Sequence, residues 1–195
     1  LLLIAHLLAS LTVGVIFRFW KYNSKSSDEN YTQRQKNKNN ISLSNLGGII
    51  GNSISTSINT ILLIGGFVVI FSVIISILKN SNLLDVLCGC VKPLFSLLQI
   101  PFSFAEGFVS GIIELTNGLN LICNIPQKKL SINIILASFL LGLGGISILL
   151  QVWSCIAKTD LSIKPYILGK ILHGIFSAFY TFIFLHFFVF FNFNL

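Results

Sequence analysis

The sequence predicts an all-α polytopic membrane protein with about four transmembrane helices, an interfacial amphipathic helix and a re-entrant half-helix hairpin. Of the 195 residues, 54% are hydrophobic and only 10% are charged, and the mean hydropathy is +0.86. Few soluble domains have such a composition. The net charge is +7, and five of the basic residues lie in one loop. This clustering favours a membrane topology signal over nucleic-acid binding.

Residues 1–20 are typical of the end of a transmembrane helix. An interfacial anchor of cations and aromatic rings follows the apolar run, at Arg18, Trp20, Lys21 and Tyr22. His6 is a lone histidine in this run, and packing or an interhelical hydrogen bond explains it more simply than ligand binding. The chain contains no Met and starts inside an apolar run, which predicts a fragment whose N-terminal part is missing.

Residues 21–45 form a basic loop rich in Asn, Ser, Lys and Gln. The loop has almost no apolar side chains to bury, so we expect it to be disordered. The positive-inside rule places it in the cytoplasm. Residues 46–195 then form the membrane domain, which begins with a polar lead-in at Leu46–Ile58 and a clear span at Thr60–Leu78.

Residues 83–99 have the pattern of an amphipathic helix that lies in the membrane interface and is kinked by Pro93. Asp85, Lys92 and Gln99 recur every seven residues on one side. The apolar side chains Leu83, Leu84, Leu87, Val91, Leu94, Phe95 and Leu98 fall on the other side.

The stretch from Pro101 to Cys123 is apolar enough to enter a bilayer, yet it carries Glu106 and Glu114. Ser103 and Glu106 match a capping box, and Asn117-Gly118 is a helix-stop signal. A helix from about residue 104 to residue 116 would be roughly 20 Å long, too short for a hydrocarbon core of about 30 Å. We therefore expect one arm of a re-entrant hairpin. Glu114 would lie in its last turn, where a carboxylate is poorly placed and a functional role is the default hypothesis.

The segment from Ser131 to Ala157 is apolar but is interrupted by the glycines at 142, 144 and 145. One interpretation is a discontinuous helix whose unwound centre faces a substrate. The other is that small residues allow close helix packing. Both stay open, because the polar residues Ser147 and Gln151 follow the interruption closely.

The last span, Pro165 to Phe191, contains Lys170 and His173 on one helical face. Snorkelling to the headgroups explains Lys170 more simply than a site does. In the alternative interpretation, Lys170 faces the hairpin as a partner for Glu114 or for an anionic solute.

The sequence holds no recognisable set of catalytic or cofactor-binding residues. The cysteines Cys88, Cys90, Cys123 and Cys155 lack zinc-like spacing, so we expect no metal site and no disulfide framework. We find no nucleotide-binding motif and no Ser/His/Asp set, and we expect neither an enzyme nor a cofactor. Base-stacking aromatics interleaved with basic residues are also absent, which argues against nucleic acid.

Three motifs occur in order: SGIIELTNGL, LGLGGIS-x3-QV and KTDL-x3-P-x3-GK-x2-HG. From about Thr60 to the C-terminus the chain resembles the C-terminal half of the YlbJ-type sporulation integral membrane proteins. These proteins belong to the group with the nucleoside-transporter/FeoB Gate, or nucleoside-recognition, domain. The resemblance implies solute- or ion-binding positions at Glu114, Thr116, Asn117, Gly118, Gly144, Gly145, Ser147, Gln151, Lys170 and His173.

The resemblance also implies a location and a function. We expect a transporter or channel half in the outer forespore membrane that moves a small anionic solute, with dipicolinic acid as the best candidate. Thr116 and Asn117 would bind the solute, Glu114 would couple a proton or cation, and Lys170 would offset solute charge. The other expected partners are the lipid bilayer and a second copy in a homo-oligomer. The alternatives are a membrane scaffold for spore envelope assembly and a nucleoside or cation transporter.

Overall fold

The computed structural model describes residues 1–19, 46–126, 131–157, 159 and 161–190, and these ranges contain helices and turns but no strand. The basic loop predicted at residues 21–45 lies outside the described residues. The elements are α1 (Leu2–Phe19), α2 (Leu46–Asn80), α3 (Leu83–Leu97), the 3-10 turn η2 (Phe102–Phe104), α4 (Ala105–Ile113), α5 (Leu115–Cys123), α6 (Ser131–Leu143), α7 (Gly145–Ile156) and α8 (Lys164–Phe190).

Four segments of the described chain are long and apolar enough to cross a membrane. They are α1, α2, the broken pair α6 and α7 taken together, and α8 as far as Phe187. The predicted all-α polytopic membrane fold is therefore confirmed.

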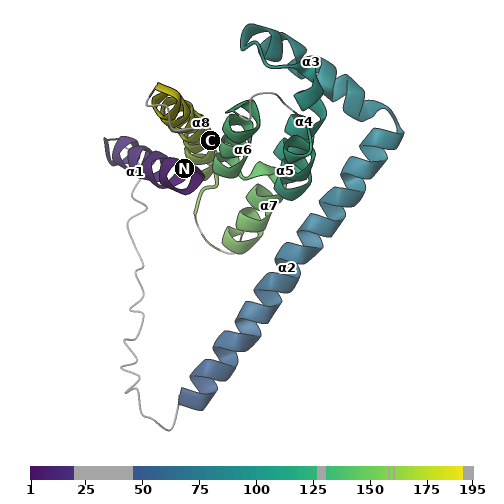
Figure 1. Cartoon of the computed structure of the whole chain (residues 1–195). Coiled ribbons are helices and arrows are strands. Elements are labelled where there is room, and N and C mark those ends of the chain that lie inside the picture. Colours follow the sequence, from purple (N-terminus) through teal and green to yellow (C-terminus); the bar gives the residue numbers. More distant parts are fainter. Residues whose placement is uncertain (20–45, 127–130, 158, 160, 191–195) are drawn as a thin grey trace.

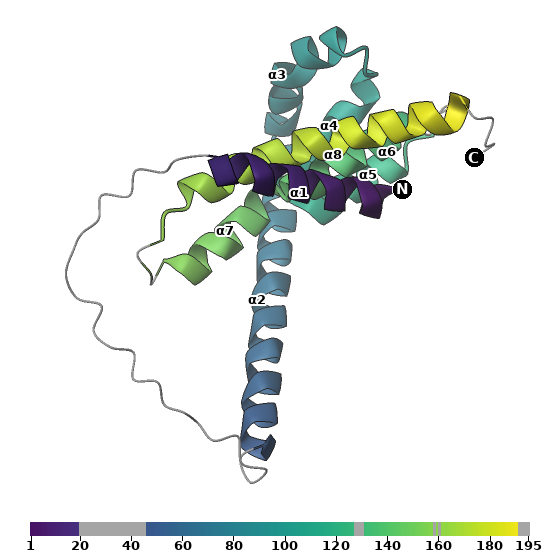
Figure 2. The ribbon, with the colours of Figure 1, turned by 90° about the vertical axis from the view of Figure 1, so that its left-hand side faces the viewer.

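Helices α6 and α8 form the most extensive packing in the molecule, and α1 covers α8 on the side away from the hairpin (Figures 1 and 2). The approach of α6 to α8 is very close, since a Cβ atom on Gly142 would lie 2.7 Å from the Cα atom of Gly174. A buried hydroxyl cluster also joins these helices, because Ser138 Oγ lies 2.8 Å from Ser177 Oγ and 2.7 Å from Thr181 Oγ1. Small residues thus set the distance between the two helices, as is common in membranes.

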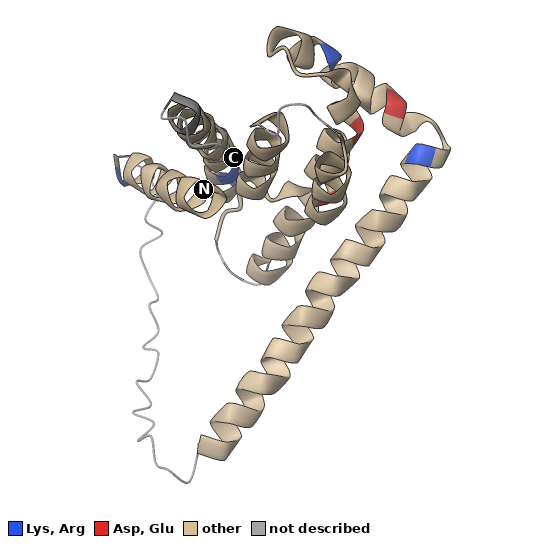
Figure 3. Ribbon diagram, in the orientation of Figure 1, with Lys and Arg blue, Asp and Glu red and all other residues tan. Residues whose placement is uncertain are grey.

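Helix α2 joins the predicted lead-in and span into one continuous helix of 35 residues. Such a helix is about 52 Å long at ~1.5 Å per residue. Its C-terminal part contacts α3, α4 and α7, while its N-terminal part extends away from the other helices (Figure 1). Figure 3 shows no charged residue along α2 until Lys79, close to its end.

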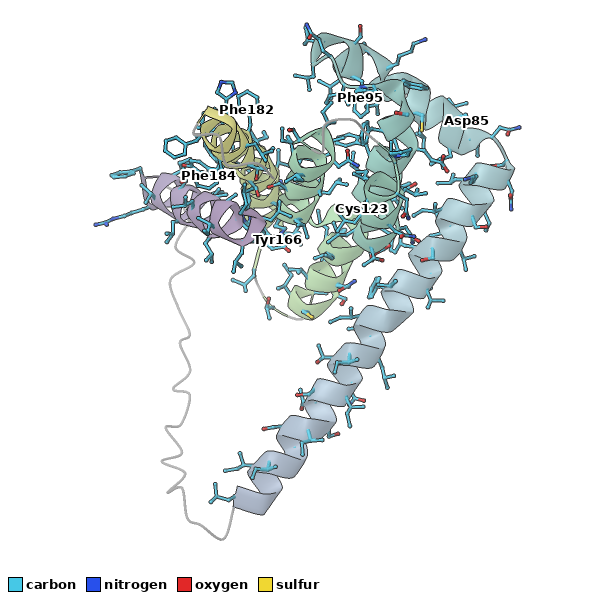
Figure 4. The ribbon with its side chains drawn as sticks, in the orientation of Figure 1. Asp85, Phe95, Cys123, Tyr166, Phe182 and Phe184 are labelled. Atoms are coloured by element: carbon cyan, nitrogen blue, oxygen red, sulfur yellow. The ribbon has the colours of Figure 1, made fainter. Side chains whose placement is uncertain are left out.

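Helix α3 confirms the predicted amphipathic helix, with Pro93 inside it. Leu84 and Phe95 are buried at 2% exposure each, while Asp85 faces solvent (Figure 4). The ring of Phe95 meets that of Phe108 on α4 at 5.3 Å. Aromatic packing therefore attaches α3 to the hairpin.

The hairpin consists of α4 and α5, two helices of nine residues each. Each is about 14 Å long, so neither can span a bilayer alone. The predicted boundary is wrong, because α4 ends at Ile113 and Asn117-Gly118 lie inside α5. The chain breaks at Glu114, which has extended backbone angles (φ −141°, ψ 121°).

The predicted capping box at the start of α4 is not formed. Phe104 occupies the N-cap position without a side-chain hydrogen bond. Glu106 instead accepts a hydrogen bond from Lys79 at 2.5 Å, across the junction of α2 and α4. Both side chains of this pair are substantially exposed, so the pair contributes at most about 1 kcal/mol.

Candidate functional site

Two helix breaks meet in the centre of the molecule, one between α4 and α5 and the other between α6 and α7. A Cβ atom on Gly145 would lie 2.9 Å from the carbonyl oxygen of Gly111 and 3.2 Å from that of Ile112. Because only a glycine fits this gap, the second break lies directly against the end of α4. Sequence positions more than 30 residues apart are thus brought together.

Glu114 caps the N-terminus of α5. One carboxylate oxygen accepts from the backbone N–H of Thr116 at 3.0 Å. The other accepts from the Thr116 hydroxyl at 2.7 Å, the Asn117 backbone N–H at 2.8 Å and the Asn117 amide at 2.9 Å. The side chain is only 2% exposed. Its negative charge faces the positive end of α5, where a carboxylate is well placed, so the expectation of an unfavourable position in a last turn is wrong.

Asn117 also connects the hairpin to α2, since its amide donates to the Ser72 hydroxyl at 2.7 Å. The two amide protons of Asn117 are therefore used by Glu114 and Ser72, and the hydroxyl proton of Thr116 is used by Glu114. In this conformation the donors of both side chains fix the hairpin, and a bound solute would have to displace one of these bonds.

The second break is made by two residues in the left-handed region, Gly144 (φ 84°) and Gly145 (φ 75°). It confirms the discontinuous helix, and the close contact at Gly142 shows that glycines also permit tight packing there. Helix α7 begins at this break without a side-chain cap, which leaves backbone N–H groups directed toward the break. Ser147 is buried and accepts a hydrogen bond of 3.3 Å from Gln151 one turn later.

Lys170 of α8 lies against the second break. Its Cε and Nζ atoms are 3.1 and 3.3 Å from the position that a Gly144 Cβ atom would take. The ion pair between Lys170 and Glu114 that the sequence allowed is absent. Within the described residues, the only ion pair joins Lys79 to Glu106. Lys170 is half-buried, and its ammonium lies beside Gly144, the residue between the end of α6 and the start of α7.

His173, one turn after Lys170, meets His6 of α1. The ring centroids are 4.2 Å apart, and His173 Nε2 lies 3.1 Å from the backbone oxygen of His6. The ring contact fits the packing expected for the His6 side chain, while the hydrogen bond uses only the backbone oxygen of residue 6. The sequence did not predict that His173 would be the partner of His6. The two residues are 167 positions apart, so no local spacing could reveal the pair.

The arrangement separates charge across the two breaks. The anionic Glu114 and its donors lie on the hairpin side, and the basic residues Lys170, His173 and His6 lie on the α8 and α1 side. Of the predicted positions, Gly118 packs the hairpin, Gly144 and Gly145 form the second break, and Ser147 and Gln151 follow it. The uncapped N-terminus of α7 and the Lys170 side chain thus lie together at the second break, and both favour negative charge.

The chain is similar to a sporulation membrane protein. It is 31% identical to the sporulation integral membrane protein YlbJ of Bacillus subtilis (strain 168) in an alignment 193 residues long, and the alignment covers 91% of this chain and 46% of that protein. The chain thus spans about half the length of this relative. No protein-family model matches the chain, and no solved structure matches it. The similarity supports a relationship with YlbJ-type proteins, and together with the four apolar segments it supports a multi-pass integral membrane protein.

Proposed function

We propose that this chain acts in sporulation as the C-terminal, Gate-type half of a YlbJ-type transporter or channel that moves a small anionic solute. The observation that carries the proposal is Lys170, a half-buried cation against a broken membrane helix, with no acidic partner among the described residues. Charged groups at such positions in membrane proteins commonly mark a solute pathway.

The α7 N-terminus and Lys170 are complementary to a carboxylate. The first N–H groups of a helix lack intrahelical acceptors and carry partial positive charge. An anion beside Gly144 would interact with these groups and with the Lys170 ammonium together. Broken helices whose N-termini point at anionic solutes recur among secondary transporters.

Dipicolinate is the best single candidate for the solute, and the outer forespore membrane is the proposed location. The name of the relative supports a membrane role in sporulation, and the solute and the location are what the resemblance to YlbJ-type proteins implies. Thr116, Asn117 and Gly118 then serve the site by fixing the hairpin, while Ser147 and Gln151 line the start of α7. No enzymatic step is needed for this function.

Uptake of radiolabelled dipicolinate into proteoliposomes tests the proposal directly, with the full-length protein in the vesicles and protein-free vesicles as the control. Saturable uptake above the control supports a transporter or channel. Absence of uptake, with correctly folded protein in the vesicles, contradicts it and favours a scaffold for spore envelope assembly. Competition by nucleosides or monovalent cations instead of dicarboxylates would favour the other Gate-type alternative.

A further inference from the structure

The basic groups at the α1–α8 contact outnumber their acidic partners. His6 and His173 touch each other, and Lys170 lies within electrostatic range of both rings. Helix α6, which packs against both α1 and α8, contains no ionisable side chain. Within the described residues, no carboxylate acts on either histidine. The cluster of His6, Lys170 and His173 therefore contains one ammonium group and two imidazole rings that can each gain a proton.

The hydrogen bond between the two helices fixes the tautomer of one ring. A backbone carbonyl can only accept, so the Nε2 atom of His173 must carry the proton in its bond to the His6 oxygen. In the neutral ring the Nδ1 atom of His173 is then the basic nitrogen. His6 contributes a second candidate, because its Nδ1 atom has no hydrogen-bond partner and no donor engages its lone pair.

Charge balance links these nitrogens to an anion. A proton on either ring places a second positive charge beside Lys170, and the two charges repel each other in a partly buried setting. A carboxylate bound next to Lys170 offsets that repulsion. By linkage, anion binding must then favour proton binding, and proton binding must favour anion binding to the same extent.

We propose that the cluster of His6, Lys170 and His173 takes up a proton together with a carboxylate anion, so that solute movement is coupled to protons through the histidines. This inference rests on the proposed function and names its coupling groups. When the anion binds near Lys170, a ring nitrogen of His173 or His6 accepts one proton from water. When the anion leaves, the ring returns the proton. Glu114 is less suited to this role, because four hydrogen bonds hold its carboxylate.

Isothermal titration calorimetry measures the coupling without requiring transport. Dipicolinate is titrated into the detergent-solubilised full-length protein at pH 7 in two buffers of different ionisation enthalpy. The difference between the two observed binding enthalpies gives the number of protons taken up. We expect uptake approaching about one proton per dipicolinate bound to the wild type. The double variant His6→Gln/His173→Gln should abolish this uptake, because it removes both proton acceptors, whereas either single variant retains one acceptor and part of the uptake.

His186 offers the matched control, since it lies in α8 like His173, is exposed and is the third histidine of the chain. His186→Gln should leave proton uptake unchanged. His6→Gln is the safer variant for folding, because the hydrogen bond of His173 goes to the backbone of residue 6. Binding without proton uptake in the wild type overturns the coupling but leaves the proposed function standing, as does full uptake in the double His variant. No dipicolinate binding by folded wild type overturns both.

Discussion

Gly118 lies so close to Gly111 that a Cβ atom on Gly118 would be 2.1 Å from the Cα atom of Gly111. The hairpin of α4 and α5 exists at this spacing only because Gly118 has no side chain, while a Cβ atom on Gly111 would meet the Leu140 side chain of α6 at 2.4 Å. The contact also explains why Asn117-Gly118 does not end a helix here. The glycine serves packing between two helices, and the asparagine serves the cap around Glu114.

Gly118→Ala should therefore destabilise the protein by at least about 1 to 3 kcal/mol, the usual cost of overpacking. The direction of this change tests the packing, because replacing glycine by alanine inside a helix normally stabilises it by about 1 kcal/mol. Gly65→Ala in α2 is the control, since a Cβ atom there meets nothing within 4 Å. Thermal unfolding of both variants in detergent measures the effect. Equal stability of the two variants would contradict the hairpin spacing.

Glu114→Gln should be more damaging than Glu106→Gln. A glutamine at 114 loses the negative charge at the start of α5 and presents an NH2 group to one set of donors. The loss should cost about 1 to 3 kcal/mol. Glu106 has only an exposed pair with Lys79, which is worth at most about 1 kcal/mol.

Stability and dipicolinate uptake of the Glu114 and Glu106 variants should be measured at matched protein levels. If Glu114→Gln is as mild as Glu106→Gln in both measurements, then the capping network does not hold the hairpin together. If Glu114→Gln keeps its stability but loses the pH dependence of uptake, coupling through Glu114 would replace coupling through the histidines.

Lys170→Gln should reduce dipicolinate uptake at least about tenfold, the effect of losing about 1.4 kcal/mol of interaction with the anion. Lys164→Gln is the matched control, because Lys164 is an exposed cation at the start of the same helix. Initial uptake rates over a range of dipicolinate concentrations would show whether affinity or turnover changes. Normal uptake by the Lys170 variant would return this residue to the snorkelling interpretation.

Ser138→Ala should loosen α6 from α8. The Ser138 hydroxyl contacts the backbone oxygen and the hydroxyl of Ser177 as well as the hydroxyl of Thr181, all within 3.0 Å. Hydrogen bonds between membrane helices average about 0.6 kcal/mol each, so the loss should be about 1 to 2 kcal/mol. Ser10→Ala is the control, because that exposed hydroxyl bonds only to its own helix. Equal thermal stability of the two variants would show that the cluster adds nothing to the packing.

Composition and apolar run length were sufficient to predict the all-α membrane fold and its four candidate spans, because the bilayer leaves few alternatives. The amphipathic helix α3 was equally clear from its seven-residue polar pattern. The break at Glu114 could not be predicted from the sequence, because tertiary packing against Gly111 overrides the local stop signal Asn117-Gly118. The pairing of His6 with His173, and the position of Lys170 against Gly144, depend on how α1, α6 and α8 pack. No spacing in the sequence contains that information.

The two cysteines of α3 should differ in reactivity, which tests how this helix packs. Cys88 is 4% exposed, whereas Cys90 is exposed. Burial raises the pKa of the Cys88 thiol, and the nearby carboxylates of Asp85 and Glu106 raise it further. A raised pKa leaves less thiolate at neutral pH, and the thiolate is the form that reacts.

Single-cysteine variants that retain only Cys88 or only Cys90 isolate the two thiols for maleimide labelling at pH 7. We expect Cys90 to react at least about tenfold faster in the folded protein, since burial and reduced thiolate both slow Cys88. The rate at Cys88 should keep rising at pH values where an ordinary thiol is already fully ionised. In denaturant the two rates should converge, because burial and the neighbouring carboxylates no longer act on Cys88. Equal rates in the folded protein would mean that α3 does not bury its Leu84, Cys88 and Phe95 face against the hairpin.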